Sequence, residues 1–233
     1  MTYTDEQTAR LAKDAAAIIA RYPRARSALL PLLHLVQSED GFVSPDGMSF
    51  CANRLGISTA EVSAVATFYT QFKRRPTGEF QVGVCTNTLC ALMGGDEVWD
   101  SLAEHLGVGN DETTPDGKVT LERIECNAAC DYAPVVMVNW EFFDNQDIES
   151  AKSLVDDLQA GRPVRSTRGP QVCTFRQVER VLAGFPDGLD GEGPAAGPAT
   201  LAGLEIARER GDVAPAMPAA DAPAPPAADT QEG

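Results

Sequence analysis

Apolar residues recur at helical spacing through roughly the first seventy residues of the chain. Leu11, Ala15 and Ile18 would share one face of a helix. A capping-box sequence starts at Thr4, and two later stretches open with a serine that suits a helix N-cap. The expected helices lie at residues 4–22, 27–37, 44–56 and 58–68. Short helices in such a row form a small bundle, which we expect over residues 1–75.

The period of the pattern changes in the next part of the chain. Alternation and a short apolar run predict strands at residues 80–84, 119–124 and 134–139, and helical spacing predicts helices at residues 91–106 and 147–159. Residues 107–117 form a polar stretch that is typical of a loop. We therefore expect a small α/β sheet covered by helices over residues 76–163, followed by a linker and a short helix over residues 164–185.

An aromatic stripe ends the last helix of the expected bundle. Phe68, Tyr69 and Phe72 follow one another at near-helical spacing. We expect these rings to pack within the bundle or onto the following domain rather than against a cofactor.

Composition sets the end of the chain apart. From Pro186 to Gly233, 28 of 48 residues are Ala, Pro or Gly, and no aromatic residue follows Phe185. Such a segment buries too little apolar surface to offset the entropy of ordering it. Residues 186–233 are therefore expected as a disordered acidic tail, in which Thr200 to Arg210 would form a short helix only against a partner.

Charge and apolar length exclude several classes of protein. The net charge of −15 argues against binding to nucleic-acid phosphates and to anionic lipid. The first residues lack the basic and apolar pattern of a signal peptide, and the longest apolar stretch, 28–36, is too short to span a bilayer. We expect neither a secreted protein nor a nucleic-acid binder nor an integral membrane protein. The six cysteines are then expected as metal ligands or buried thiols rather than disulfides.

Four of these cysteines fall in two close pairs, each after an expected strand. Cys85 and Cys90 have C-x4-C spacing, Cys126 and Cys130 have C-x3-C spacing, and 35 residues separate the pairs. Loops at the carboxyl ends of strands can converge in an α/β sheet. Two thiol pairs, each able to hold one iron, are what a binuclear 2Fe–2S cluster requires.

Other uses of the thiols stay open at this point. A structural zinc ion also takes four thiolates, and both spacings suit it. A thiol–disulfide enzyme fits less well, because no C-x-x-C occurs in the chain. Unliganded buried thiols would account for one or two cysteines, and this is the expectation for the isolated Cys51 and Cys173. His34 and His105 are expected in core or surface roles rather than as ligands.

The two cysteine loops resemble those of a known family. Cys85-Thr-Asn-Thr-Leu-Cys90, and Glu125-Cys-Asn-Ala-Ala-Cys130 with Ala133-Pro134 behind it, are similar to the thioredoxin-like 2Fe–2S subunits (the E subunits) of NADH-quinone oxidoreductase, respiratory complex I. Upstream stretches such as Thr67-Phe-Tyr-Thr-Gln-Phe72 match the helical part of that family. The resemblance covers about residues 5–162.

The resemblance implies a fold and a set of ligands. The fold would be α+β or α/β, with an N-terminal helical bundle followed by a thioredoxin-like 2Fe–2S domain. Cys85, Cys90, Cys126 and Cys130 would hold one 2Fe–2S cluster, and no residue of this chain would be catalytic. The cluster would take single electrons from the FMN of a partner subunit that oxidises NADH. FMN and NADH would belong to that partner, since this chain has no comparable phosphate-binding loop.

The resemblance also implies an assembly. The chain would be a subunit of the proton-translocating NADH:quinone oxidoreductase, without a complete active site of its own. It would join the FMN- and NADH-binding subunit and other peripheral-arm subunits on the cytoplasmic side of the cell membrane, with no direct membrane insertion and no nucleic acid. Three alternatives stay open: the equivalent diaphorase subunit of an NAD-linked hydrogenase or formate dehydrogenase, a structural zinc scaffold, and a free-standing thioredoxin-like ferredoxin, which would form a stable homodimer without a flavoprotein partner.

Two departures from the family pattern carry expectations of their own. Some relatives have Leu-Gly where this chain has Asn127-Ala128. If glycine there supplies a positive φ, Ala128 predicts a different loop shape. The chain also continues past the usual family end near Arg162, and our hypothesis is that this extension clamps a neighbouring subunit.

Overall fold

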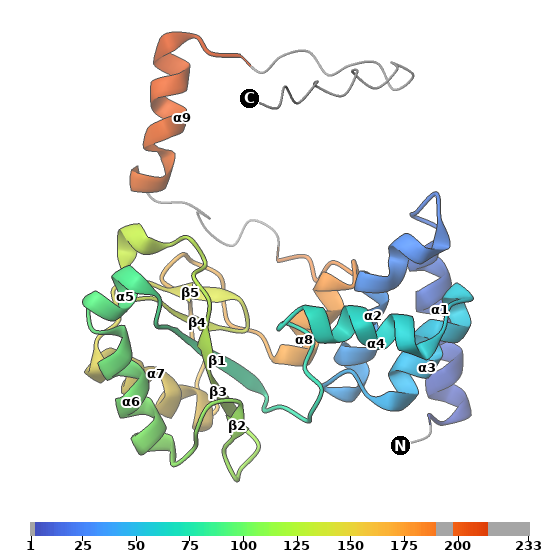
Figure 1. Ribbon diagram of the computed structural model, residues 1–233. Helices are drawn as coiled ribbons and strands as arrows, with labels where there is room; N and C mark the ends of the chain where they lie inside the picture. The colour runs from blue at the N-terminus through green and yellow to red at the C-terminus, as the bar shows by residue number, and fades with distance from the viewer. Residues whose placement is uncertain (1–2, 190–197, 214–233) are drawn as a thin grey trace, which may run out of the picture. The chain divides into compact units, whose positions relative to one another are not determined.

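The computed structural model describes residues 3–189 and 198–213. The chain divides into two compact units, Met1–Ala195 and Ala196–Gly233, which are described separately. The first unit contains a helical part and a sheet part, each with its own cluster of buried apolar side chains (Figure 1). The domain boundaries expected from the sequence stay predictions.

The helical part forms as the apolar periodicity predicted. Its elements are α1 (Asp5–Ile19), the 3-10 turn η1 (Ala25–Ala28), α2 (Leu29–Asp40), α3 (Pro45–Leu55), α4 (Thr59–Phe68) and, from much later in the chain, α8 (Phe175–Leu182). The side chains of Thr4, Ser44 and Ser58 each accept a hydrogen bond from a backbone N–H in the first turn of the helix that follows. These caps confirm the helix starts that the sequence predicted.

Helix α8 returns to the N-terminal helices although it follows the sheet in sequence. Glu179 of α8 is fully buried, and its Oε2 lies 2.6 Å from Nδ1 of His34 on α2. The guanidinium of Arg176 donates to the backbone carbonyls at the end of α2. The buried face of α8 is thus used inside the chain, and the hypothesis that the extension clamps a neighbouring subunit stays a prediction.

The sheet part is built around one central strand. The strand order is β2-β3-β1-β4-β5, and the strands are β1 (Phe80–Cys85), β2 (Glu112–Thr113), β3 (Val119–Ile124), β4 (Val136–Val138) and β5 (Glu141–Phe143). β1 pairs with β3 in parallel and with β4 in antiparallel. The three predicted strands are present. β2 lies within the stretch predicted as a loop, and β5 was not predicted.

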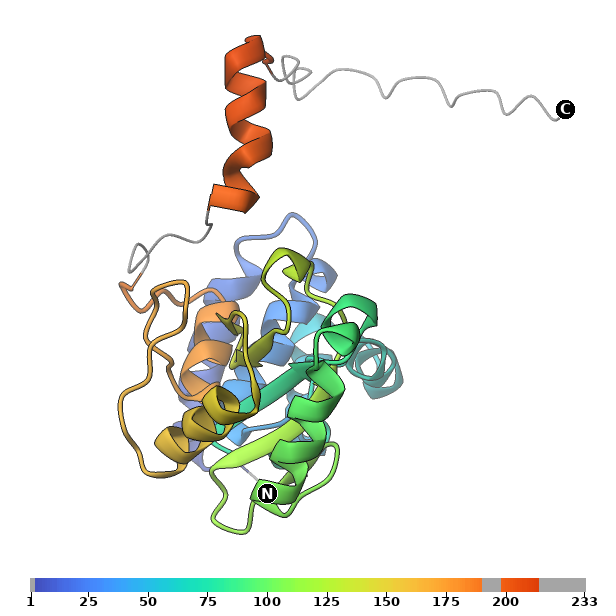
Figure 2. The ribbon, with the colours of Figure 1, turned by 90° about the vertical axis from the view of Figure 1, so that its left-hand side faces the viewer.

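Two helices lie side by side against the sheet (Figure 2). These are α6 (Gly95–Leu106) and α7 (Ile148–Gln159), and their apolar faces join the buried valines of β1 and β4 in one cluster. The helix predicted at residues 91–106 is interrupted. The short α5 (Thr88–Leu92) ends before Gly94, whose φ of +105° breaks the helix and sets a new direction for α6.

The second unit is described over helix α9 (Pro198–Arg210) and the three residues after it. A helix was predicted here only against a partner, and it forms in the single chain. The rest of the expected disordered tail, residues 190–197 and 214–233, lies outside the described residues. In the part of the chain that is described, every helix is too short or too polar to cross a membrane.

Candidate metal centre

Both cysteine loops leave the sheet at the same edge. β1 and β3 are parallel neighbours, and their last residues, Cys85 and Ile124, are register partners. Cys85 therefore ends one strand, and Cys126 follows two residues after the end of the other. Cys90 lies on α5 and Cys130 opens the 3-10 turn η2 (Cys130–Tyr132). The convergence of the two loops that the strand pattern predicted is confirmed.

The four thiols lie as two pairs that differ in exposure. The Sγ atoms of Cys126 and Cys130 are 3.5 Å apart, with Cys126 exposed and Cys130 partly exposed. Cys85 and Cys90 are both buried and share an apolar cluster with Ala129 of the second loop. Within residues 3–189 and 198–213, no three His, Cys, Asp or Glu side chains gather as they would around one ion.

Thiols of the two pairs affect one another's pKa. The pKa of the Cys85 thiol is raised to about 11, mainly by burial; the backbone N–H of Asn87 opposes this rise, and the nearby Cys90 and Cys126 contribute to it. The hydrogen bond with Cys126 raises the pKa of the Cys130 thiol, with contributions from burial and from Cys126 and Cys85 as charges. Four thiolates in this place would repel one another, so a group with positive charge is needed to hold them together.

The second cysteine loop keeps a conformation that suits glycine. Ala128 has a φ of +57°, and its backbone N–H points at Cys126 Sγ, 3.4 Å away. The expectation that Ala128 changes the loop shape is therefore wrong. A positive φ costs an alanine on the order of 1 kcal/mol, and the loop keeps the conformation in spite of that cost.

The first cysteine loop is pressed against the start of α6. A Cβ added to Gly95 would lie 2.6 Å from the carbonyl oxygen of Cys85 and 2.8 Å from that of Cys90. Only glycine lets the helix approach the backbone of both cysteines so closely. The Gly94-Gly95 pair at the start of α6 thus positions the first thiol pair.

A polar contact that the sequence did not reveal links the two loops. The side-chain amide of Asn87 donates to the carboxylate of Glu125 at 3.3 Å, across 38 positions of sequence. Each residue flanks a cysteine, and that adjacency was the only signal available. The contact depends on how two strands are aligned, which side-chain identity alone does not reveal.

The remaining cysteines and both histidines lie elsewhere. Cys51 is fully buried, as predicted, and burial raises the pKa of its thiol to about 12. Cys173 is only partly covered, so the prediction of a buried thiol is wrong there. His34 lies in the helical core against Glu179, and His105 Nε2 lies 2.7 Å from the surface carboxylate of Asp156. These are the core and surface roles expected of the two histidines.

Known proteins of similar sequence match the part of the chain that holds this site. A family model described as thioredoxin-like [2Fe-2S] ferredoxin matches residues 15–159. The E subunit of NADH-quinone oxidoreductase from Mycobacterium tuberculosis is 62% identical over 221 residues, which make up 94% of this chain and 88% of that protein. NADH-quinone oxidoreductase subunit 2 of Thermus thermophilus is 36% identical over 157 residues, or 66% of this chain and 87% of that protein.

A solved structure shows the same fold in a different enzyme. The NAD+-reducing [NiFe]-hydrogenase in its H2-reduced state matches with a TM-score of 0.53 at 20% identity, over 58% of this chain and 22% of that chain. At this identity the likeness concerns the fold alone. The sequence matches reach further, since they include both cysteine loops and most of the N-terminal helices. The chain therefore belongs to the thioredoxin-like [2Fe-2S] ferredoxin family, and within it to the E subunits of NADH-quinone oxidoreductase.

Proposed function

We propose that Cys85, Cys90, Cys126 and Cys130 hold one 2Fe–2S cluster and that this chain carries single electrons through it. A bound cluster of this kind accepts and returns one electron at a time. The observation that supports the proposal best is the pairing of the thiols, on loops that leave two parallel neighbouring strands at one edge. Each iron of a binuclear cluster takes two thiolates, and the chain offers two pairs.

The surroundings of the thiols fit the charge of such a group. The backbone N–H of Ala128 donates to Cys126 Sγ, and a donor of this kind stabilises negative charge on the sulfur. Burial of Cys85 and Cys90 excludes water from one side of the site. The family model that matches residues 15–159 is that of a [2Fe-2S] ferredoxin, which supports an iron–sulfur cluster over a zinc ion.

The electron donor in this proposal is the FMN of a partner subunit that oxidises NADH. A hydride delivers two electrons together, so a one-electron acceptor beside the flavin separates them. Three exposed apolar side chains lie in the first cysteine loop or directly after it, and they suit contact with another protein: Leu89, Leu92 and Met93. A partner that covers them would lie close to Cys90, on the same short helix.

The assembly in this proposal is the proton-translocating NADH:quinone oxidoreductase. This chain would be a peripheral subunit on the cytoplasmic side of the cell membrane, attached through the flavin-bearing subunit and other peripheral-arm subunits. The name of the Mycobacterium tuberculosis relative, at 62% identity, supports this assembly. The hydrogenase likeness is one of fold and does not favour the diaphorase alternative.

The test is spectroscopic and uses the full chain. We would express it anaerobically with iron and sulfide and record absorption and electron paramagnetic resonance before and after dithionite. The expected result is a coloured protein that is silent when oxidised and shows about one spin per chain when reduced. A colourless protein with zinc and no sulfide would overturn the proposal.

Variants assign the ligands. Serine at any one of the four paired cysteines should lower the iron content or alter the reduced spectrum, because a thiolate is lost from one iron. Cys173→Ser is the matched control, since this cysteine lies outside both loops and should leave the spectrum unchanged. A Cys126→Ser protein with the wild-type spectrum would remove that residue from the ligand set.

A further inference from the structure

Two adjacent arginines between α4 and β1 have no partner among the residues that the structure describes. Arg74 and Arg75 are exposed, and neither forms an ion pair or a side-chain hydrogen bond with any described residue. Most other arginines of the first unit are engaged, as Arg123 is with Asp96 and Arg168 with Asp144, whereas Arg24 is a single exposed arginine without a described partner. In a chain with 34 acidic residues, two neighbouring cations left unpaired are available to something outside it.

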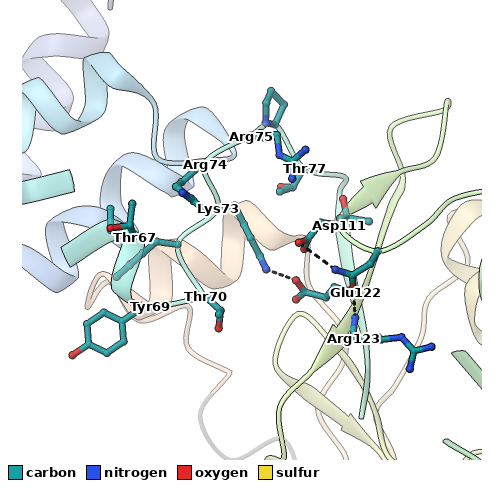
Figure 3. Close-up of a pocket in the computed structure, with 15 residues that line it drawn as sticks. Thr67, Tyr69, Thr70, Lys73, Arg74, Arg75, Thr77, Asp111, Glu122 and Arg123 are labelled. Carbon is teal, nitrogen blue, oxygen red and sulfur yellow. Dashed lines mark hydrogen bonds and ion pairs between the residues drawn. The ribbon is translucent and has the colours of Figure 1, made fainter. Parts of the chain in front are cut away.

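These arginines border an open pocket of about 520 Å³ (Figure 3). One wall is the end of α4 and the segment after it, with Thr67, Thr70 and Thr77, and the other wall comes from the sheet part. In Figure 3, the side chain of Lys73 reaches across the pocket to the carboxylate of Glu122.

Among the charged side chains that line the pocket, Lys73 is paired and Asp111 adds a second carboxylate beside Glu122, so the cations without a described partner are those at the rim. Lys73 and Glu122 form an ion pair in which each side chain is only about a tenth exposed. Arg123 also lines the pocket, but its guanidinium stacks on the ring of Trp99 at 4.0 Å and pairs with Asp96. The free positive charge at this place therefore belongs to Arg74 and Arg75.

Two aromatic rings are exposed beside the same segment. Phe68 is 78% exposed and Tyr69 is 41% exposed, and their rings meet edge to face with centroids 4.9 Å apart. Tyr69 in turn contacts Phe72, which is buried. The predicted packing is thus right for Phe72 and wrong for Phe68. The exposed Phe68 ring packs on Tyr69, which in turn packs on the buried Phe72, so this ring is already positioned for contact with a partner.

We propose that Phe68, Tyr69, Arg74 and Arg75 form a docking surface for an acidic segment of another protein subunit of the assembly. Aromatic residues and arginine are the types enriched where protein interfaces gain most of their binding energy. Two free guanidiniums select carboxylates, which they bind with paired hydrogen bonds. We call these four residues the arginine–aromatic surface.

The chemistry of the surface favours a protein segment over other anions. A small anion would meet the arginines but leave Phe68 in water. Nucleic acid and anionic membranes are bound by extended clusters of cations, whereas this surface offers two arginines. The inference rests on the proposed function only in requiring partner subunits, and it concerns a different face from the cysteine loops: α4 and the segment after it rather than α5.

The first experiment identifies the occupant within the intact assembly. A benzophenone amino acid would replace Thr70, which is exposed and lines the pocket, in a tagged chain purified with its partner subunits. Irradiation should join it to one segment of another subunit that is rich in Asp and Glu. The same probe at Arg24, an exposed position without a pocket, is the control. The absence of a cross-link to another subunit, or a cross-link to a segment without excess acidic residues, would overturn the proposal.

The second experiment tests the charge. Arg74→Glu with Arg75→Glu should weaken retention of the chain in the assembly by about tenfold or more, and most strongly at low salt. Lysine at both positions keeps the charge and should retain most of the binding. Arg24→Glu makes the same kind of charge change elsewhere and should have no effect. Retention of the double glutamate variant at the wild-type level would contradict the proposal.

A separate measurement keeps this result apart from the electron-transfer proposal. The iron content and the reduced spectrum of the isolated chain should be the same in all these variants, because none of the changed residues touches a cysteine loop. A chain without a cluster would disprove the proposed function, whereas an intact cluster with unchanged assembly would disprove only the docking surface.

Discussion

Single residues of the second cysteine loop show what residue type alone predicts and what it does not. The pairing of Cys126 with Cys130 follows from their spacing. The φ of Ala128 does not, because the tendency of alanine to avoid positive φ was outweighed by the surrounding loop. In the same way, nothing in the sequence distinguishes an exposed Cys126 from a buried Cys85. The exposure of each cysteine depends on how its loop packs at the edge of the sheet.

The positive φ of Ala128 leads to a stability prediction. Ala128→Gly should raise the free energy of unfolding by about 1 kcal/mol, because glycine adopts this conformation without steric cost. The hydrogen bond to Cys126 Sγ should remain. Ala129→Gly is the control of opposite sign, since Ala129 has a φ of −105° and should lose stability. Urea unfolding of both variants measures the difference, and a loss of stability in Ala128→Gly would contradict the account.

Glu61 leads to a prediction about acid. Backbone and side-chain hydrogen bonds from Ser58, followed by one from Arg26, lower the pKa of Glu61 from 4.5 to about 2. Because the pKa is lower in the folded chain, the stabilising effect is complete above 4.5 and is lost as the pH falls toward 2.

Glu61→Gln tests this effect, since glutamine keeps the capping geometry without titrating, as Gln7 does at Thr4. The difference in unfolding free energy between wild type and variant should shrink over this pH range. Urea unfolding at a series of pH values measures it, and a constant difference would contradict the lowered pKa.

At the scale of elements, long periodic stretches were predictable and short ones were not. The helix starts at Ser44 and Ser58 were predictable because they depend on hydrogen bonds between residues that are close in sequence. β2 has two residues and β5 has three, too few for an alternating pattern to show. The break between α5 and α6 was missed because the apolar spacing continues through Gly94.

Gly95 gives a prediction about how α6 meets the cysteine loop. Gly95→Ala should destabilise the chain by about 1–3 kcal/mol and lower its iron content, because the new methyl group meets two backbone carbonyls. Gly203→Ala on α9 is the matched control, since no atom lies within 4 Å of the added Cβ there. Iron analysis and thermal unfolding report the effect. Normal iron content in Gly95→Ala would contradict the prediction, because it would show that the cysteine loop can shift without losing iron.

At the scale of the molecule, the sequence showed two kinds of pattern but not how the chain connects them. No feature of residues 175–182 predicts that this helix packs against helices from the start of the chain. Its position depends on a contact over 145 residues between His34 and Glu179, two residues that no local rule would pair. Long-range pairing of this kind is visible only in the folded chain.

This contact gives a prediction for the whole first unit. Glu179→Ala should cost roughly 2–4 kcal/mol, because it leaves His34 buried without its partner. Glu179→Gln keeps a hydrogen-bonding group and should cost less. Arg180→Ala on the same helix breaks an exposed pair with Asp14 and should cost about 1 kcal/mol or less. Urea unfolding ranks the three, and equal losses would contradict the importance of the buried pair.

The position of α8 also sets the order in which the parts can be completed during synthesis. The buried cluster of the helical part draws on residues from Leu11 to Phe72 and again on Ala183, whereas the cluster of the sheet part ends with Val172. A ribosome therefore finishes the sheet part while the face of α2 that receives α8 is still uncovered. Of the two parts, the helical part leaves the ribosome first, but its core is completed last.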